Sequence, residues 1–410
     1  MTVYAGVDWG FEHSQVFALA DEGSVVIDER VPSAPDAVAR VIERLVSHAG
    51  SSADVLVGIE KATGNVVEQL LHAGLSVYNI NPAKVQAARV VVSMSGAKDD
   101  RRDARVLAKL VESFREDLVC LVPQGSDMRR LRRLGRHRHA LVKQRTQLQN
   151  RLSAAFREYF PAMLQVGSLD TEWHLRLVCR APTPLDAREL AVDEVQSILS
   201  ASRARTRAEA VLATLDATPP TALDGVYDAM RFEIPMWAEQ LLMVTKQIRL
   251  VEQQSAALLE RLSTDSADGP SDVQLVLSLP GVGQRTAVVM LGEGLVDLAR
   301  HNLPAARCLT GVAPVTEATG KRQSKKNPKV VMRRACNHYL RDALHNAVMA
   351  GVGNHPELQQ RYRRRRARGL TPGAACRGEA DRLLRILHAM LRDRTLYGQP
   401  AEPPTVRLSS

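Results

Sequence analysis

The sequence predicts a mixed α/β domain at residues 1–120, followed by a chain that is mostly helical. Before residue 81, short apolar runs alternate with turn residues, which is typical of strands. Beyond residue 125, apolar residues recur three and four positions apart, which is typical of amphipathic helices. A chain of 410 residues is long enough for two or three domains. We expect a basic helical stretch with a helical insertion at 121–234, a coiled coil and linker at 235–272, a mostly helical domain at 273–395 and a flexible tail at 396–410.

The first domain begins with three short strands and then alternates between helix and strand. The expected elements are strands Val3–Asp8, Gln15–Ala20 and Ser24–Glu29, a helix with its apolar face from Val38 to Val46, strand Val55–Ile59, helix Asn65–Ala73, strand Leu75–Ile80 and helix Arg101–Phe114. This βββαβαβα order matches a ribonuclease-H-like (RuvC-like) core. In that topology the ends of the first and fourth strands lie side by side.

Four carboxylates follow these elements. Asp8 and Glu60 each come after an apolar strand, and Asp100 and Asp103 are three positions apart, so they share one face of a helix. A single acid after a strand is most often a turn residue, but this order and spacing favour a shared site. Clustered carboxylates repel one another unless cations neutralise them. We therefore expect all four to be catalytic ligands of one or two Mg²⁺ ions, which would clamp a phosphodiester under attack.

The composition indicates a polyanionic partner. The chain has 55 Lys and Arg against 45 Asp and Glu, a net charge of +10 and a pI of about 9.6. The five cysteines show no metal-binding spacing, which is typical of reduced thiols in a cytosolic protein. We expect no signal peptide, because the chain runs straight into a strand, and no membrane span.

Residues 126–160 form a long helical stretch in which basic side chains outnumber acids until Glu158. A charge run is usually a solvated helix face, but the scarcity of acids favours contact with nucleic acid. The residues expected to make this contact are Arg129, Arg130, Arg132, Arg133, Arg136, Arg138 and Lys143.

Residues 235–262 carry apolar residues at alternating spacings of four and three, from Trp237 to Leu262, as in a coiled coil. Four heptads are short, so an intramolecular helical hairpin competes with a dimer seam. The preceding residues 161–232 read as an inserted helical region without a chemical signature.

The C-terminal domain opens with a helix–hairpin–helix signature from Leu277 to Ala287. Its glycines permit a tight turn, and the next helix would begin with free N–H groups that can hold a phosphate. A plain pair of helices is the alternative. Basic runs follow, and the residues expected to bind nucleic acid here are Gly281, Gly283, Lys321, Arg322, Lys325, Lys326, Arg333, Arg334, Arg363, Arg364, Arg365 and Arg366.

These motifs resemble those of the DEDD-type insertion-sequence transposases, which are bridge-RNA-guided recombinases related to Piv-type DNA invertases. The resemblance covers roughly 1–155 and 235–395. The matching residues are Gly6-Val7-Asp8, Ile59 to Gly64, Asn81-Pro82, Asp100 and Asp103 with Ala104, Arg105, Leu107 and Ala108, Leu279 to Gly283, Gly311 to Pro314, Thr319 to Lys321, and Leu340, Arg341, Ala343 and Leu344.

The resemblance implies a division of labour between the two domains. The four acids would hold metal, and a serine of the C-terminal domain, just before a glycine, would form a covalent bond to a DNA phosphate. This chain has Thr319 at that position, a departure from the family pattern, and Ser324 is the second candidate. A threonine hydroxyl is a competent nucleophile, although its methyl group crowds in-line attack.

The resemblance also implies the partners: DNA, a structured guide RNA, and further copies of the chain in a dimer or tetramer, because recombination joins four DNA ends. It implies a cytoplasmic, nucleoid-associated bacterial protein. Three functions remain open from the sequence: a transposase or site-specific recombinase, a metal-dependent nuclease of the junction-resolvase kind without a covalent step, and a non-catalytic nucleic-acid-binding protein.

Overall fold

The structure is a computed structural model of the chain, and it describes residues 1–62, 64–92, 99–121, 123–217, 225–264, 269–317 and 329–399. The chain divides into two compact units, Met1–Gln124 and Gly125–Ser410. The regions expected at 121–234, 235–272 and 273–395 fall almost entirely within the second unit, and its long helix α11 (Val226–Arg261) runs across the boundary between the first two of them.

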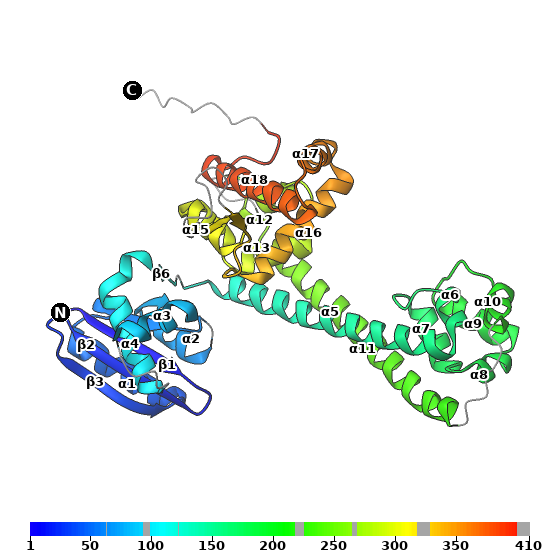
Figure 1. Ribbon diagram of the computed structural model, residues 1–410, viewed down its shortest axis with the longest axis horizontal. Coiled ribbons are helices and arrows are strands. Elements are labelled where there is room, and N and C mark those ends of the chain that lie inside the picture. The colour runs from blue at the N-terminus through cyan, green and yellow to red at the C-terminus, as the bar shows by residue number, and fades with distance from the viewer. Residues whose placement is uncertain are drawn as a thin grey trace. The chain divides into compact units, whose positions relative to one another are not determined.

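The first unit is built on one six-stranded mixed sheet with the strand order β3-β2-β1-β4-β5-β6. Its first three strands are labelled in Figure 1. The strands are β1 (Val3–Trp9), β2 (His13–Ala20), β3 (Val25–Pro32), β4 (Val55–Ile59), β5 (Ser76–Asn79) and β6 (Val119–Cys120). β1 pairs parallel with β4, and β4 pairs parallel with β5. The expected α/β class and the neighbouring positions of the first and fourth strands are therefore confirmed.

Helices cover both faces of this sheet. They are α1 (Pro35–Ala49), α2 (Asn65–His72), α3 (Pro82–Val92) and α4 (Asp100–Phe114). Alternate residues of β1 point to opposite faces, as the pleat of a strand requires. Val3, Ala5 and Val7 share a core with α1 and α2, whereas Tyr4 packs on the side of α4.

Two elements of this unit differ from the sequence-based expectation. The helix α3 and the edge strand β6 were not expected. The apolar residues of α3 are too evenly spread to define one face. β6 is two residues long and pairs only with β5, so it carries no periodic signal.

The second unit is organised around two long helices, α5 (Ser126–Tyr159) and α11 (Val226–Arg261). They lie side by side, and the apolar stripe of α11, including Leu241, Val244 and Ile248, is buried (Figure 1). The intramolecular alternative thus accounts for the heptads. A subunit contact made by this same stripe is not compatible with its burial within one chain.

The expected insertion is helical. It contains α6 (Pro161–Val166), α7 (Glu172–Arg180), α8 (Pro184–Arg188), α9 (Val192–Ala201) and α10 (Ala208–Asp216). These helices share one apolar core with α5 from Leu141 onward and with α11 up to Val251. The insertion is therefore anchored by packing rather than tethered by its ends alone.

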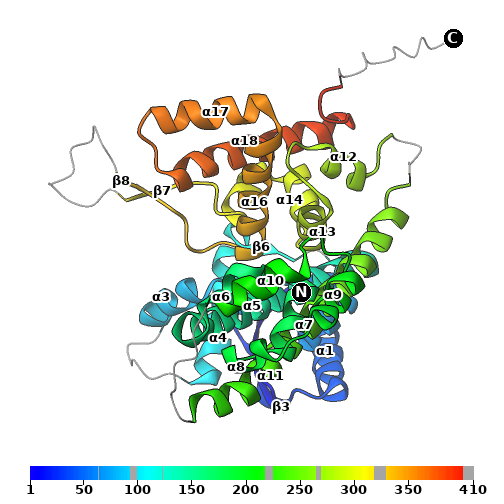
Figure 2. The ribbon, with the colours of Figure 1, turned by 90° about the vertical axis from the view of Figure 1, so that its right-hand side faces the viewer.

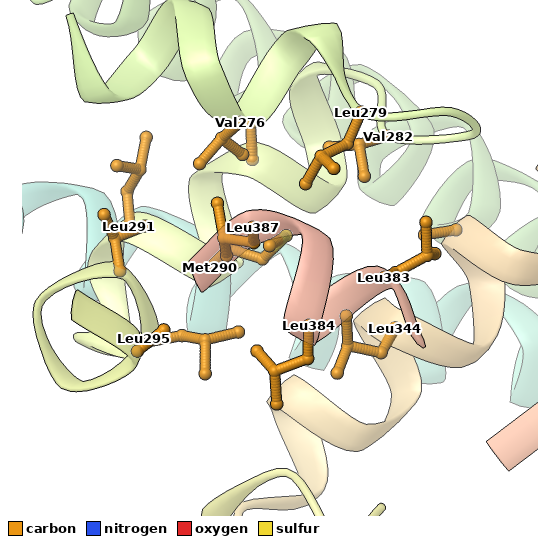
Figure 3. Packing of buried hydrophobic residues seen from close by; sticks show 14 of the residues in the cluster. Val276, Leu279, Val282, Met290, Leu291, Leu295, Leu344, Leu383, Leu384 and Leu387 are labelled. Atoms are coloured by element: carbon orange, nitrogen blue, oxygen red, sulfur yellow. The ribbon is translucent and has the colours of Figure 1, made fainter. Parts of the chain in front are cut away.

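The C-terminal part of this unit is also helical, with one two-stranded sheet. Its elements are α12 (Asp272–Ser278), α13 (Gln284–Gly292), α14 (Leu295–His301), α15 (Leu303–Leu309), β7 (Val315–Glu317), β8 (Lys329–Val331), α16 (His338–Asn354), α17 (Pro356–Ala367) and α18 (Pro372–Asp393), which Figure 2 shows. Leu291, Leu344 and Leu387 from three different helices meet in its aliphatic core (Figure 3). Among the described residues, no helix is long and apolar enough to cross a membrane.

Candidate active site

The four predicted carboxylates line one cavity of the first unit, which we call the acid cavity. Asp8, Glu60, Asp100 and Asp103 contribute to the wall of this hollow, whose volume is about 350 Å³. Asp8 lies near the end of β1, Glu60 directly follows the neighbouring parallel strand β4, and Asp100 and Asp103 lie in the first turn of α4. The structure thus brings together residues that lie up to 95 positions apart in the sequence.

Two paired glycines set the distance between the strands and α4. Gly6 of β1 and Gly58 of β4 lie opposite each other in the sheet. A Cβ at Gly6 would lie 1.9 Å from the Ala104 carbonyl oxygen, and one at Gly58 would lie 2.7 Å from that of Leu107. Only glycine allows the α4 backbone to come so close. Asp8 and Glu60 each follow their glycine by two positions, so this close packing brings all four acids to one cavity.

The start of α4 suits a cluster of acids. Asp99 caps the helix, since its side chain accepts a hydrogen bond from the Arg101 N–H. Asp100 and Asp103 then lie at the positive end of the helix dipole, which favours negative charge. The same turn is therefore a favourable place to hold the two carboxylates of α4.

The crowding of these acids alters the protonation of Asp8. Burial, together with the negative charges of Asp100, Asp103 and Glu60, raises the pKa of Asp8 from 3.8 to about 6, and Lys61 partly opposes this. Each of these effects disfavours the ionised carboxylate. The cavity therefore contains more negative charge than its own residues neutralise.

Sequence reasoning missed the two cations in the wall of the acid cavity. Arg89 of α3 donates two hydrogen bonds to Asp103, with Nε–Oδ1 and Nη2–Oδ2 distances of 2.5 and 2.6 Å. The Lys61 ammonium lies 5.4 Å from the centre of the Trp9 ring, and the Trp9 indole donates to the Lys61 carbonyl. The position of Lys61 directly after Glu60 was a usable signal, but the contact of Arg89 depends on a helix that was not expected.

The donor set of the acid cavity fits a hard divalent cation, because carboxylate oxygens are the ligands that Mg²⁺ prefers. Burial and the neighbouring acids raise the pKa of Asp8, so a cation beside it would favour its ionised form. As the side chains lie, no three Asp, Glu, His or Cys residues of the described chain are grouped to hold one ion. In this arrangement Arg89 occupies both oxygens of Asp103. The chemistry of the four donors suits a divalent metal, whereas their side chains are not grouped around one point.

The shifted pKa of Asp8 makes a first prediction about stability. Because its folded pKa is raised, ionisation of Asp8 destabilises the metal-free fold as the pH rises from 3.8 towards about 6, and the full penalty is present above that. In EDTA at pH 7.5 the Asp8→Asn protein should therefore melt at a higher temperature than the unmodified protein. The difference should narrow below pH 6. A lower melting temperature of Asp8→Asn at pH 7.5 would contradict the crowding of the acids.

The basic residues expected on α5 divide into two groups. Arg136 forms a two-point ion pair with the buried Glu293, at 2.7 and 2.8 Å, and Arg138 pairs with Glu252 at 2.7 Å. Arg132 donates to the Gly292 carbonyl, and Arg130 donates to Gln254. Arg129, Arg133 and Lys143 are exposed.

Arg132, Arg136 and Arg138 therefore have a structural role in place of the nucleic-acid contact expected from the sequence. The hydrogen bond of Arg132 and the ion pairs of Arg136 and Arg138 hold α5 against α11 and the end of α13. Burial alone would raise the pKa of Glu293, but hydrogen bonds from Arg136 and Asn337 outweigh it and hold that pKa below its usual range. The acids that neutralise this helix are distant in sequence, so the local scarcity of acids overstated its free charge.

The turn between α12 and α13 contains the two predicted glycines, and they differ in role. A Cβ at Gly281 would lie 2.1 Å from the Ala347 carbonyl oxygen, so this glycine is needed where the turn packs on α16. Gly283 has open space around its Cα and precedes the first residue of α13. The turn borders a cavity of about 690 Å³ whose wall includes Arg138 and Arg285. Both glycines line this cavity, but only Gly281 is required by the packing of the turn.

The remaining predicted basic residues are scattered over the C-terminal part. Arg365 is held by the buried Glu379 at 2.6 Å, so its contribution is structural. Arg363, Arg364 and Arg366 of α17 are exposed, and so is Arg334. Arg333 is half-buried. Thr319, Lys321, Arg322, Ser324, Lys325 and Lys326 lie outside the described residues.

Comparisons with known proteins give one match that contains the residues of the acid cavity and one that lies in the C-terminal part. Residues 5–161 match the transposase family model of the DEDD IS110 type, and residues 273–363 match the transposase family IS116/IS110/IS902. The matched segments together cover more than half of the chain, and they lie in the same order as the acid cavity and the C-terminal motifs.

Individual relatives extend the match over nearly the whole length. The chain is 28% identical to a protein of Streptomyces coelicolor assigned as the mini-circle transposase for IS117, over 97% of this chain and 96% of the relative. It is 26% identical to the IS110 43.6 kDa protein of the same species, over 96% and 95%. It is 31% identical to y4uE of Sinorhizobium fredii, assigned as a transposase, over 49% and 57%. With its acid cavity and both family segments in place, the chain belongs to the IS110-type DEDD transposases and is a DNA transposase.

Proposed function

We propose that this transposase cuts and rejoins the DNA of a mobile element with the four carboxylates of the acid cavity and Mg²⁺. The convergence of Asp8, Glu60, Asp100 and Asp103 on one cavity carries this proposal. The strand order β3-β2-β1-β4-β5 supports a ribonuclease-H-like domain, in which such a cluster is the expected seat of phosphodiester chemistry. Membership in the DEDD family implies a divalent metal, and the oxygen ligands favour Mg²⁺.

The carboxylates, Lys61 and Trp9 of the acid cavity would have different roles. The four carboxylates would hold the cation, which when bound supplies electrostatic stabilisation of the phosphate under attack. Lys61, which lies beside Trp9, is placed to contact the DNA backbone at the cavity. Trp9 also packs against Gly64, the residue before α2, whose Cβ would lie 2.5 Å from the Trp9 ring.

The nucleophile that we propose is the Thr319 hydroxyl of the C-terminal part. The family resemblance supports this choice, and Thr319 itself lies outside the described residues. The Thr319 Oγ would lose its proton and bond to phosphorus, while the bond from phosphorus to a deoxyribose oxygen breaks and that oxygen takes up a proton. The reverse sequence rejoins a strand without ATP, because the phosphoester bond is conserved.

We further propose that a structured guide RNA binds this protein and that exposed basic residues of α5 contact its phosphates. Arg133 and Lys143 are exposed on α5, in contrast to Arg136 and Arg138, which have buried or half-buried acid partners. Two exposed cations on one long helix can follow a phosphate backbone.

Charge reversal on α5 tests this division. The Arg133→Glu/Lys143→Glu protein should fold normally and bind RNA more weakly, with the salt slope of log K reduced by about 1.5 for two lost phosphate contacts. Arg136→Gln is the matched comparison: it should instead lower the free energy of unfolding by about 3 kcal/mol, because it leaves Glu293 buried without its cation. Salt-dependent filter binding and urea unfolding measure the two effects. An unchanged salt slope in the double variant would identify α5 as a solvated face.

We propose that the active form is a dimer or tetramer, since rejoining four DNA ends needs at least two active sites held together. The heptads of α11 are occupied by contacts within the chain, so a subunit contact would use other surfaces. Sedimentation of the nucleic-acid-bound protein at micromolar concentration should give more than one chain per complex, and a monomer would contradict this expectation.

The proposed function is tested by incubating the purified protein with RNA extracted from cells that carry the element, together with a plasmid that contains the element and its flanks. Strand cleavage and rejoining should occur with Mg²⁺ and stop in EDTA. Cleavage that persists in EDTA would overturn the proposed metal-dependent chemistry.

A further inference from the structure

Arg89 and Asp103 both line the acid cavity and are joined there by an ion pair. The guanidinium meets both carboxylate oxygens, at 2.5 and 2.6 Å, in the two-point geometry that gives the strongest ion pairs. The Asp103 side chain is only 5% exposed, whereas the Arg89 side chain is 29% exposed. Arg89 therefore reaches from the rim of the cavity to one of its most buried acids.

This pair neutralises one of the four acids of the cavity when no metal is bound. A buried carboxylate is costly unless a cation neutralises it. Asp103 has Arg89 for this purpose, whereas no hydrogen bond from a cation to Asp8 is seen among the described residues. Arg89 and Lys61 line the cavity with four acids, so two cations face four carboxylates. Asp103 is thus neutralised by Arg89, but its two oxygens are then not available to a metal ion.

A metal ion and Arg89 cannot both use the same two oxygens of Asp103. Each acceptor already receives a short hydrogen bond from the guanidinium, and a cation at those oxygens would also repel it. We propose that Arg89 is a competing counterion: it holds Asp103 when no metal is present, and metal binding must displace it. This inference rests on the proposed metal site and adds a residue that sets the affinity of that site.

The position of Arg89 makes the displacement structurally simple. Arg89 comes from α3 and Asp103 from α4, so the pair joins two separate helices rather than neighbours on one helix. The guanidinium of Arg89 is partly exposed, so water can replace Asp103 as its hydrogen-bond partner. Asp103 can stay in place, because it lies in the first turn of α4, whose backbone packs on Gly6.

Removing the competitor should strengthen metal binding. In a titration with Mn²⁺ alone, followed by electron paramagnetic resonance of the free ion at pH 7.5, Arg89→Gln should bind at least about tenfold more tightly than the unmodified protein, which corresponds to about 1.4 kcal/mol. Arg89→Lys keeps the charge but loses the two-point contact, so its affinity should lie between the two. Arg44→Gln, which removes the ion pair between Arg44 of α1 and Glu29 of β3, is the matched control and should leave the Mn²⁺ affinity unchanged.

A second variant ties the effect to Asp103. In an Asp103→Asn background, Arg89→Gln should no longer raise the Mn²⁺ affinity, because the contact for which the metal competes is already gone. Without metal, Arg89→Gln should melt at a lower temperature than the unmodified protein, and Mn²⁺ should restore more of its stability. This shift in melting temperature reports metal binding independently of catalysis and shows that the variant is folded.

The outcomes separate this inference from the metal site itself. If Arg89→Gln binds Mn²⁺ with unchanged or weaker affinity while Asp8→Asn abolishes binding, the metal site stands and the competing role of Arg89 is wrong. If the unmodified protein and Arg89→Gln both fail to bind Mn²⁺, the proposed metal site is wrong and the inference falls with it. An equal gain of affinity in the Asp103→Asn background would also overturn the proposal.

Discussion

The Glu60→Gln protein should bind its nucleic acids with nearly unchanged affinity and cut DNA at least about a thousandfold more slowly than the unmodified protein. Glu60 lines the acid cavity with the other three carboxylates, and its register is fixed by the pairing of β4 with β1. An amide of the same shape keeps the packing but removes one negative charge from the metal ligands. Single-turnover cleavage and filter binding, measured on the same preparation, separate the two effects.

A surface acid provides the control for this experiment. Asp36 lies in the first turn of α1 in an exposed pair with Arg40, away from the acid cavity. The Asp36→Asn protein should cut DNA at the normal rate. If Glu60→Gln recombines as fast as Asp36→Asn, Glu60 has no part in the chemistry and the four-carboxylate site is wrong.

The second large effect concerns the hydroxyl of Thr319. Thr319→Val keeps the shape of the side chain and removes the hydroxyl, so covalent attachment of the protein to DNA should fall below detection. Thr319→Ser removes the crowding methyl group, so its adduct should form at least as fast as that of the unmodified protein. Denaturing gel electrophoresis of end-labelled DNA detects the adduct, and peptide mass spectrometry identifies the attached residue.

The outcomes at this position distinguish three mechanisms. An adduct that persists in Thr319→Val and disappears in Ser324→Ala would place the nucleophile at Ser324. DNA cleavage without an adduct in the unmodified protein would favour a metal-dependent nuclease with water as the nucleophile. In either case the four acids are untouched, so metal-dependent nicking should survive in Thr319→Val.

Much of the first unit could be predicted because its signals are local. Apolar runs between turn residues define β1 to β4, and the i, i+3 spacing of Asp100 and Asp103 defines one face of α4. The sequence also contains the two glycines that allow α4 to pack closely on the strands, since Gly6 and Gly58 each stand two positions before an acid. What the sequence does not state is that the two glycines lie opposite each other beneath the α4 backbone.

The parts that could not be predicted depend on contacts between distant residues. The partners of Arg136 and Arg138 lie 157 and 114 positions away, so a count of nearby charges treated both as free. Arg89 belongs to a helix with a weak periodic pattern, and its role follows only from its contact with Asp103. The heptads of α11 illustrate the same limit, because spacing indicates an apolar stripe but does not say which helix covers it.

The central claim is that the four carboxylates of the acid cavity bind the metal that cuts DNA. The most direct test is a crystal structure of the protein soaked with Mn²⁺ in place of Mg²⁺, in which anomalous scattering locates the ion. We predict an anomalous peak within coordination distance of Asp8 and at least two of Glu60, Asp100 and Asp103, with Arg89 withdrawn from Asp103. A fully occupied Mn²⁺ site elsewhere, with the acid cavity empty and the Arg89–Asp103 pair intact, would contradict the claim.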